Sequence, residues 1–341
     1  QMKEWGVRVR WSGRRPKLWK SVIDELEVAQ EKTKNNKTID VVFCLNYGGR
    51  AEIADACAAI AREVRDGKIS GDRVTEKMIA EHLYNPDIPD CDLVIRTAAI
   101  HDDNPEISGA VARGIPVFER TQAWGALMRG YPNALCISGT HGKTTTTSMC
   151  THIMMAAEKD PTVMIGGTLP LLHARHRVGK GNTIIMESCE YYNSFLSLNP
   201  TIAVILNIEA DHLDFFKDLQ DVERSFRKFA SLVPADGLIV ANGDDKNTRD
   251  TLAGMPYLSF GFDAKNDVYG KNFSEDFSGF DVFCGGQPYA HLHLGVIGRH
   301  NALNALAACA VAWKFGISGE TAAAALAASN CNKHTYRYCI D

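Results

Sequence analysis

The chain has 341 residues, which at roughly 150 residues per domain predicts about two domains. Apolar residues make up 45% and charged residues 23%, proportions typical of folded globular proteins, and this excludes a wholly disordered chain. The 37 basic and 41 acidic side chains give a formal net charge of −4, so the overall charge does not point to nucleic acid or an anionic membrane as a partner. No uninterrupted apolar run reaches about 18 residues, and we expect no membrane span.

The ten cysteines are scattered and form no C-x-x-C pair, so we expect neither a zinc ribbon nor a thioredoxin-type redox site. Most of them lie in apolar runs, as Cys44 and Cys309 do, and this predicts buried, reduced thiols. Residues 1–5 (QMKEW) lack the apolar core of a secretion signal. We therefore expect a cytoplasmic protein.

The first twenty residues are strongly basic, with seven lysines or arginines against Glu4. They indicate either a solvated face beside a helix N-terminus or an anion-binding surface. The apolar stripe of Leu18, Val22, Leu26 and Ala29 predicts a helix that ends at residues 35–36. Beyond it the pattern predicts a buried strand at 39–45, helices at 51–64 and 74–83, and a strand at 91–95.

Strands and helices alternate regularly after residue 98. We predict strands at 117–118, 134–138, 183–186, 201–206 and 238–241. Helices are predicted at 104–113, 122–128, from Lys143 onward, and at 219–232, 301–315 and 319–328. This alternation predicts an α/β fold with a mostly parallel sheet covered on both faces. Residues 330–341 show no clear period, and we expect an unstructured tail there.

Residues 138–145 (SGTHGKTT) follow an apolar strand and precede a helix, as a phosphate-binding loop does. Glycines let backbone N–H groups approach phosphate oxygens, and the helix N-terminus adds further donors and a positive dipole end. Lys143 can reach the β- and γ-phosphates, and the Thr144 hydroxyl can bind Mg²⁺. Ile137 stands where the common pattern has its first glycine, so this is the shorter G-T-x-G-K-T form. The residues predicted to bind nucleotide are Gly139, Thr140, His141, Gly142, Lys143, Thr144 and Thr145.

Two further polar side chains follow predicted strands. Glu187 ends the strand at 183–186, and His212 follows the strand at 201–206. Ligands of an open α/β sheet bind at the C-terminal ends of its strands, and hard cations prefer oxygen ligands. Glu187 and His212 are therefore candidate ligands for Mg²⁺. The alternatives are an ordinary strand-end carboxylate and a loop histidine that is hydrogen-bonded to a neighbour.

From Thr97 to about Ser329 the chain resembles the Mur ligases of peptidoglycan synthesis. Four motifs in order carry the resemblance: 139–147 (GTHGKTTTT), 187–196 (ESCEYYNSFL), 207–214 (NIEADHLD) and 298–304 (GRHNALN). Residues 97–100 (TAAI) and 103–106 (DNPE) resemble the end of the family's UDP-binding domain. His141 in the phosphate loop favours the branch that adds L-alanine, although a murein tripeptide ligase shares this histidine.

The first 97 residues or so resemble a second family, the isoprenyl (undecaprenyl) diphosphate synthases. The similar stretches are 7–15 (VRVRWSGRR), 45–50 (LNYGGR) and 89–97 (PDCDLVIRT). In that family the arginine matching Arg96 helps to hold isopentenyl diphosphate, a role that suits bidentate guanidinium–phosphate pairing. The family's aspartate-bearing diphosphate loop and its Ser-Gly-Glu…Arg stretch have no counterpart here. We expect a fusion or an assembly artefact.

The two resemblances imply a partial prenyltransferase-like α/β segment at 1–97 and a remnant of a UDP-binding, Rossmann-like domain at 98–130. They imply a Mur-ligase P-loop central domain, which binds ATP, at 131–329. The family's C-terminal domain closes over ATP and supplies amino-acid contacts, and residues 330–341 do not resemble its start. We therefore expect that the flanking Mur ligase domains are truncated, which puts turnover in doubt.

The Mur ligase resemblance implies ATP-dependent amide formation through an acyl phosphate, with UDP-N-acetylmuramate, L-alanine and ATP as substrates. Lys143 would stabilise the β- and γ-phosphate oxygens, Thr144 and Glu187 would hold one Mg²⁺, and His212 would hold a second ion. His300, Asn301 and Asn304 would line the adenine pocket, or would cap the helix that follows them. Two alternatives remain: an isoprenyl diphosphate transferase that uses Arg96, and a non-catalytic fusion that binds nucleotide.

Overall fold

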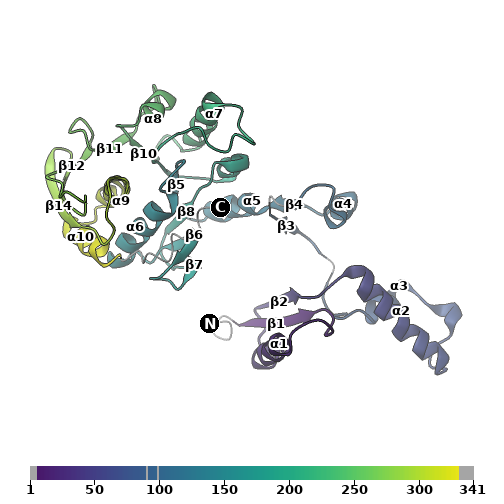
Figure 1. Cartoon of the computed structure of the whole chain (residues 1–341). Helices are drawn as coiled ribbons and strands as arrows, with labels where there is room; N and C mark the ends of the chain where they lie inside the picture. Colours follow the sequence, from purple (N-terminus) through teal and green to yellow (C-terminus); the bar gives the residue numbers. More distant parts are fainter. Residues whose placement is uncertain (1–5, 90, 98–99, 330–341) are drawn as a thin grey trace. The chain divides into compact units, whose positions relative to one another are not determined.

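The computed structural model describes residues 6–89, 91–97 and 100–329, and the chain divides into two compact units, Gln1–Asp92 and Leu93–Asp341. Arg96 thus belongs to the second unit (Figure 1). The tail predicted at 330–341 and part of the motif at 97–100 lie outside the described residues. Within the described ranges, no helix is both long and apolar enough to cross a bilayer.

The first unit is built on a two-stranded parallel sheet in which Val7 lies opposite Ile39. The helices and the strand predicted in this part are found close to their expected positions. The structure adds a strand at 7–12, inside the basic stretch. The elements are β1 (Val7–Ser12), α1 (Lys20–Thr33), β2 (Ile39–Cys44), α2 (Gly49–Arg65), the 3-10 turn η1 (Gly71–Arg73) and α3 (Glu76–Glu81).

Arginines of the basic stretch form ion pairs with carboxylates of the first unit. Arg10 lies 2.5 Å from Asp87 and 3.5 Å from Asp40, and Arg14 binds Asp55 at 2.7 Å. The hydrogen bond to Asp87 raises the pKa of Arg10 above its ordinary value. Because these guanidinium groups have carboxylate partners, the structure favours a solvated, internally paired face over an anion-binding surface.

The expectation of a buried strand at 39–45 is wrong. The side chains of Ile39 and Phe43 are 56% and 38% exposed, and the fully buried apolar residues described in this unit are Val9, Ala56 and Ile60. A strand is buried on both faces only inside a larger covered sheet, and a two-stranded sheet leaves much of its surface open.

The second unit begins with a small parallel pair, β3 (Val94–Arg96) and β4 (Val117–Glu119), accompanied by α4 (Pro105–Ala112) and α5 (Arg120–Met128). A ten-stranded sheet follows, in the order β14-β13-β12-β11-β10-β9-β5-β8-β6-β7. Strands β6, β8, β5, β9, β10, β11 and β12 run parallel, and β7, β13 and β14 run antiparallel to their neighbours. The predicted α/β fold with a mostly parallel sheet is confirmed.

The strands of this sheet are β5 (Asn133–Ser138), β6 (Thr162–Leu169), β7 (Ala174–Arg177), β8 (Thr183–Glu187), β9 (Ile202–Ile205), β10 (Leu238–Asn242), β11 (Leu258–Gly261), β12 (Val268–Lys271), β13 (Gly279–Cys284) and β14 (Gln287–His293). The helices are α6 (Lys143–Ala156), the 3-10 segment η2 (Tyr191–Ser197), α7 (Leu219–Ala230), α8 (Lys246–Thr251), α9 (Arg299–Lys314) and α10 (Gly319–Ala328).

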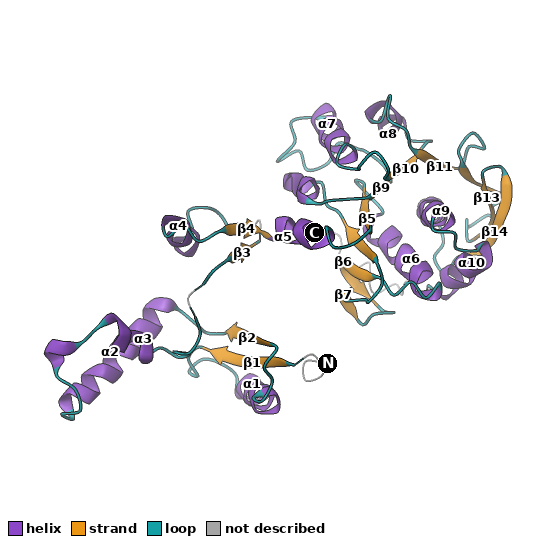
Figure 2. Ribbon diagram, turned by 180° about the vertical axis from the view of Figure 1, so that it is seen from behind, coloured by secondary structure: helices purple, strands orange, loops and turns teal. Residues whose placement is uncertain are grey.

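Side chains alternate between the two faces of the central strand β5. Leu135 and Ile137 pack into a cluster with residues of α6, α9 and α10, whereas Ala134 and Cys136 join a second cluster with residues of α7 and η2. Figure 2 shows α6, α9 and α10 together inside the curve of the sheet. Both faces of the sheet are therefore covered, as expected for parallel strands.

The cysteines divide by environment. Cys136, Cys150, Cys284 and Cys309 are buried free thiols in the second unit, as predicted, and burial raises the pKa of Cys136 and Cys150 to about 12. The expectation of burial is wrong for Cys44, Cys57, Cys91 and Cys189, which are exposed. Cys44 is exposed because the sheet that contains it is uncovered.

Candidate active site

The phosphate loop lies at the switch point of the large sheet. Strand β5 runs between β8 and β9, and the chain leaves it at Ser138 and enters α6 at Lys143. Gly142 precedes the helix with φ 86°, and a Cβ there would lie 2.5 Å from Asn304 Oδ1. Only glycine fits this conformation and this close approach. The structure thus places the loop and a helix N-terminus where α/β proteins bind phosphate.

Asn207 holds the loop in shape, a role that the sequence did not reveal. Its Oδ1 accepts from the backbone N–H of His141 at 2.8 Å, and its Nδ2 donates to the carbonyl of His141 at 3.0 Å. The carbonyl of Asn207 also accepts from the N–H of Thr140 at 3.1 Å. The second residue after β9 therefore fixes the backbone of the phosphate loop.

Lys143 points its ammonium into the base of the loop. Its Nζ donates to the carbonyls of Gly139 at 2.6 Å and Thr140 at 3.1 Å. It also lies 3.0 Å from a carboxylate oxygen of Glu190, whose side chain is only 2% exposed. The predicted phosphate lysine is thus positioned at the loop, with a buried carboxylate partner that was not predicted.

Glu187 and Thr144 meet as predicted. The Thr144 hydroxyl donates to Glu187 Oε1 at 2.8 Å, and the N–H of Gly166 donates to Glu187 Oε2 at 2.7 Å. These hydroxyl and carboxylate oxygens are donors that suit a hard divalent cation beside phosphates. Gly166 is a further site residue, and its place in β6 gave no signal in the sequence.

His212 lies beside Glu190. Its Nε2 is 3.8 Å from Glu190 Oε1 and 4.0 Å from Asp211 Oδ2, and potential ligand atoms of these three residues lie within 4.8 Å of one another. The predicted set therefore separates into a Thr144–Glu187 pair and a His212 group that includes Glu190. The groups at this second position are two carboxylates and an imidazole, which could also hold a divalent cation.

Tyr191 orients the His212 ring. The two rings stack with centroids 4.4 Å apart, and the Tyr191 hydroxyl donates to Asp214 at 2.5 Å. The hydrogen bond to Asp214 raises the pKa of Tyr191 above its usual range. His212 has a left-handed backbone with φ 51°, as do Tyr192 and Asn193 nearby. Such backbone clusters are costly and are common at functional sites.

The three residues proposed for the adenine pocket lie at the start of α9. Asn304 is buried against Gly142, and Asn301 is buried and donates to the carbonyl of Ile297 at 2.8 Å. Asn301 Oδ1 has no hydrogen-bond partner among the described residues. His300 is exposed. The capping alternative is wrong, because the cap residue is Gly298 and no side chain caps this helix.

Arg96, the proposed diphosphate ligand, lies in β3. Its guanidinium donates to the carbonyl of Ile100 at 2.6 Å and lies 2.5 Å from Asp102. Both partners belong to the second unit, which begins at Leu93. The arginine is therefore engaged within its own unit.

Two cavities of about 420 and 430 Å³ share Glu187 in their walls. The first is lined by all the predicted loop residues except Gly139, together with part of β6. The second is lined by residues of α5 and η2, among them Trp124 and Tyr191. The cavity at the phosphate loop and the cavity beside α5 and η2 therefore meet at the carboxylate of Glu187.

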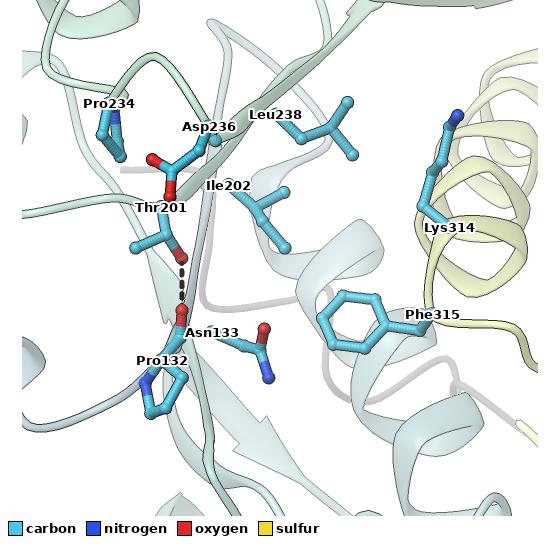
Figure 3. A pocket seen from close by; sticks show the side chains of 10 residues that line it. Pro132, Asn133, Thr201, Ile202, Pro234, Asp236, Leu238, Lys314 and Phe315 are labelled. Carbon is cyan, nitrogen blue, oxygen red and sulfur yellow. Dashed lines mark hydrogen bonds between the residues drawn. The ribbon is translucent and has the colours of Figure 1, made fainter.

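A third cavity, of about 370 Å³, lies at the opposite ends of the strands (Figure 3). It is lined by the starts of β5, β9 and β10 and by the end of α9, and the Thr201 hydroxyl donates to the carbonyl of Pro132 at 3.1 Å. It contains none of the predicted site residues, so the loop edge is the candidate active site.

Comparison with known protein families agrees with this geometry. Residues 137–312 match the Mur ligase middle domain. The chain belongs to the Mur ligase family. Residues 1–101 match a second family model, described as a putative undecaprenyl diphosphate synthase. The resemblance to two families is confirmed. The Mur ligase match covers more of the chain, so a transferase function for the whole is not favoured.

Curated relatives named UDP-N-acetylmuramate–L-alanine ligase match the Mur ligase part. The one from Agathobacter rectalis is 44% identical over 235 residues, 67% of this chain and 51% of the relative. The one from Caldanaerobacter subterraneus subsp. tengcongensis is 43% identical over 236 residues, 68% of this chain and 51% of the relative. The chain thus spans about half the length of these relatives. An isoprenyl transferase from Bifidobacterium longum is 92% identical over 98 residues, 29% of this chain and 37% of that protein.

Solved structures of Mur ligases share the fold. A UDP-N-acetylmuramate-alanine ligase from Thermotoga maritima has a TM-score of 0.61 at 26% identity and covers 94% of this chain and 68% of its own. A UDP-N-acetylmuramate:L-alanyl-gamma-D-glutamyl-meso-diaminopimelate ligase from Neisseria meningitides has a TM-score of 0.68 at 24% identity. The match covers 97% of this chain and 93% of that protein.

Proposed function

We propose that the second unit binds Mg²⁺-ATP and acts in ATP-dependent amide formation between the carboxylate of UDP-N-acetylmuramate and the amine of L-alanine. The observation that carries the proposal is the phosphate loop at the switch point, with Lys143 at its base and Thr144 bonded to Glu187 at 2.8 Å. The names of the Agathobacter and Caldanaerobacter relatives support the alanine-adding branch over a tripeptide ligase.

In this reaction the sugar acid's carboxylate attacks the γ-phosphorus, ADP leaves, and an acyl phosphate forms. The amine of L-alanine then attacks the acyl carbon and forms the C–N bond, the acyl C–O bond breaks, and inorganic phosphate leaves with that oxygen and the electron pair. The nitrogen loses a proton to give the amide. Lys143 and the N–H groups at the start of α6 bind the phosphate oxygens and neutralise charge during transfer. Asn207 fixes the loop that leads into α6, because it holds His141 on both its N–H and its carbonyl.

Thr144 and Glu187 would hold Mg²⁺, and His212 would hold a second ion. When bound, these cations would neutralise phosphate charge. Gly166 and Tyr191 orient the two sets of ligands through the contacts described above. Asn304 and Asn301, with His300, form the side of the site that would receive adenine. The unpartnered Oδ1 of buried Asn301 is an acceptor suited to an exocyclic amine.

The domain limits follow from the same proposal. Residues 98–130 correspond to a remnant of a UDP-binding domain, and residues 131–329 to the ATP-binding domain. Substrates are small molecules, and the buried free thiols of the second unit suit a reducing, cytoplasmic setting.

Titration calorimetry with Mg²⁺-ATP on the full chain tests nucleotide binding. Lys143→Ala should reduce the affinity at least 100-fold, and an unchanged affinity would refute the assignment of the loop. Phosphate release with UDP-N-acetylmuramate, L-alanine and ATP together tests the reaction. Binding of nucleotide without such release would identify the chain as a non-catalytic nucleotide-binding protein instead.

A further inference from the structure

Glu190 is a buried carboxylate beside the phosphate loop. It precedes η2, three residues beyond Glu187, and its side chain is 2% exposed. A carboxylate at this depth is stable only with a partner that compensates for lost hydration. Its partner is the ammonium of Lys143, with Nζ–O distances of 3.0 and 3.2 Å.

The ammonium of Lys143 is fully engaged by this arrangement. It carries three N–H donors, and four acceptor atoms surround it: both oxygens of Glu190 and the carbonyls of Gly139 and Thr140. A triphosphate that recruits this lysine therefore competes with Glu190 for its charge. Because Glu190 is enclosed by protein, it keeps the lysine at the base of the loop when the site holds no nucleotide.

Glu190 also contacts the second reactive group. Its Oε1 lies 3.8 Å from Nε2 of His212, and the side chain of His212 is 33% exposed. One buried carboxylate thus lies between the phosphate lysine and the histidine that follows β9.

We propose that Glu190 is the positioning residue of this site: it holds Lys143 under the phosphate loop, limits the attraction of the lysine for phosphate, and fixes the spacing between Lys143 and His212. The part that concerns the reaction rests on the proposed function. The part that concerns Lys143 can be tested by nucleotide binding alone.

The first experiment measures ADP affinity without metal by calorimetry on the full chain. Glu190→Gln removes a negative charge next to Lys143 and should raise the affinity about tenfold, since the anion no longer competes for the ammonium. Glu209→Gln is the matched control, because Glu209 lies beside the loop at 3.7 Å from His141 but is 58% exposed. Its effect should stay within twofold, owing to solvent screening. An unchanged or weaker affinity in Glu190→Gln would overturn the proposal.

The second experiment separates kcat from KM for phosphate release. Glu190→Gln should lower kcat about 100-fold without raising the KM for ATP, because the lysine is present but no longer positioned. Glu190→Asp keeps the charge and withdraws it by one methylene, so it should bind ADP like the wild type and lose about tenfold in kcat. Glu190→Asp also keeps the proposal testable if the Glu190→Gln protein does not fold. A raised KM at unchanged kcat contradicts a positioning role. A wild-type chain without turnover would refute the proposed reaction, and the ADP comparison would still decide the role of Glu190.

Discussion

Replacement of Gly166 by alanine tests whether the Thr144–Glu187 pair is the metal-binding part of the site. A Cβ at residue 166 would lie 2.7 Å from Glu187 Oε1 and 3.0 Å from Oε2. Real Cβ contacts shorter than 3.4 Å are uncommon, so the carboxylate has to move by about 0.7 Å. That shift lengthens its bonds to the Thr144 hydroxyl and to the N–H of residue 166, now 2.8 and 2.7 Å.

The expected size follows from the role of these contacts. Groups that orient a metal ligand typically contribute 10- to 100-fold to metal affinity, or about 1.4 to 2.7 kcal/mol. The gain in ADP affinity on addition of Mg²⁺ should therefore fall about tenfold or more in Gly166→Ala. Binding of ADP without Mg²⁺ should remain within threefold of the wild type, because Lys143 and the loop are untouched.

Calorimetric titrations of ADP with and without Mg²⁺ measure this ratio directly. Gly109→Ala in α4 is the control, because nothing lies within 4 Å of a Cβ there and alanine suits a helix interior better than glycine. It should leave the Mg²⁺-dependent gain unchanged. A Gly166→Ala protein that keeps the full gain would refute the assignment of Glu187 as a metal ligand positioned by β6.

Three further predictions concern the loop, a pH-dependent turn and the two units. Asn207→Ala removes two hydrogen bonds to His141 and should lower the free energy of unfolding of the second unit by about 1–3 kcal/mol in urea titrations, with weaker ADP binding. Hydrogen bonds from Ser278 and Ser274 lower the pKa of Asp276 from its ordinary value of 3.8 to about 2. The ionised carboxylate therefore stabilises the folded state at pH values above 3.8, and this contribution is lost as the pH falls toward 2. The difference in Tm between the wild type and Asp276→Asn should accordingly shrink from pH 5 to pH 2.5, whereas a constant difference would show that the turn does not titrate. Finally, scanning calorimetry should resolve two transitions, and ADP should raise only the one that belongs to the second unit; a single transition that shifts as a whole would contradict independent units.

Much of the second unit could be predicted because its strands carry strong local signals. The strands at 134–138 and 183–186 are short apolar runs between turn residues, and the structure finds β5 and β8 there. β1 was missed, although Val7, Val9 and Trp11 alternate with Arg8 and Arg10 in the period of a strand, because the arginines suggested a charged surface. The strands β6, β7 and β11 to β14 were also missed. They are not short apolar runs: β6 contains Gly166 and Gly167, and β14 contains Gln287, His291 and His293.

The exposure of β2 could not be predicted from its sequence. Its residues 39–44 (IDVVFC) are apolar enough for a covered strand, but burial depends on what lies against the strand rather than on its own composition. The two-stranded sheet places nothing over Ile39 and Phe43, and both stay exposed. Composition predicted the strand correctly and its surroundings incorrectly.

The positioning residues were missed for a related reason. Gly166 and Glu187 are 21 residues apart in sequence, and Asn207 and His141 are 66 apart, so no local motif joins them. Their contacts exist because parallel strands β6, β8, β5 and β9 are neighbours whose carboxyl ends meet at one edge. Chain spacing predicts the residues proposed to bind phosphate, whereas the sheet order determines which residues support them.

The strand ends at this edge together supply the groups proposed to bind ligands and the groups that position them. β5 leads into Lys143, β8 into Glu187 and Glu190, and β9 into Asn207 and His212. Phosphate transfer requires charges that are already in place when the nucleotide arrives, since reorganisation in the transition state would raise the barrier. Supporting residues at or just beyond the ends of neighbouring strands meet this requirement, because the sheet holds them in place. The chemistry of the site therefore depends on the strand order of the sheet as much as on the loop motif.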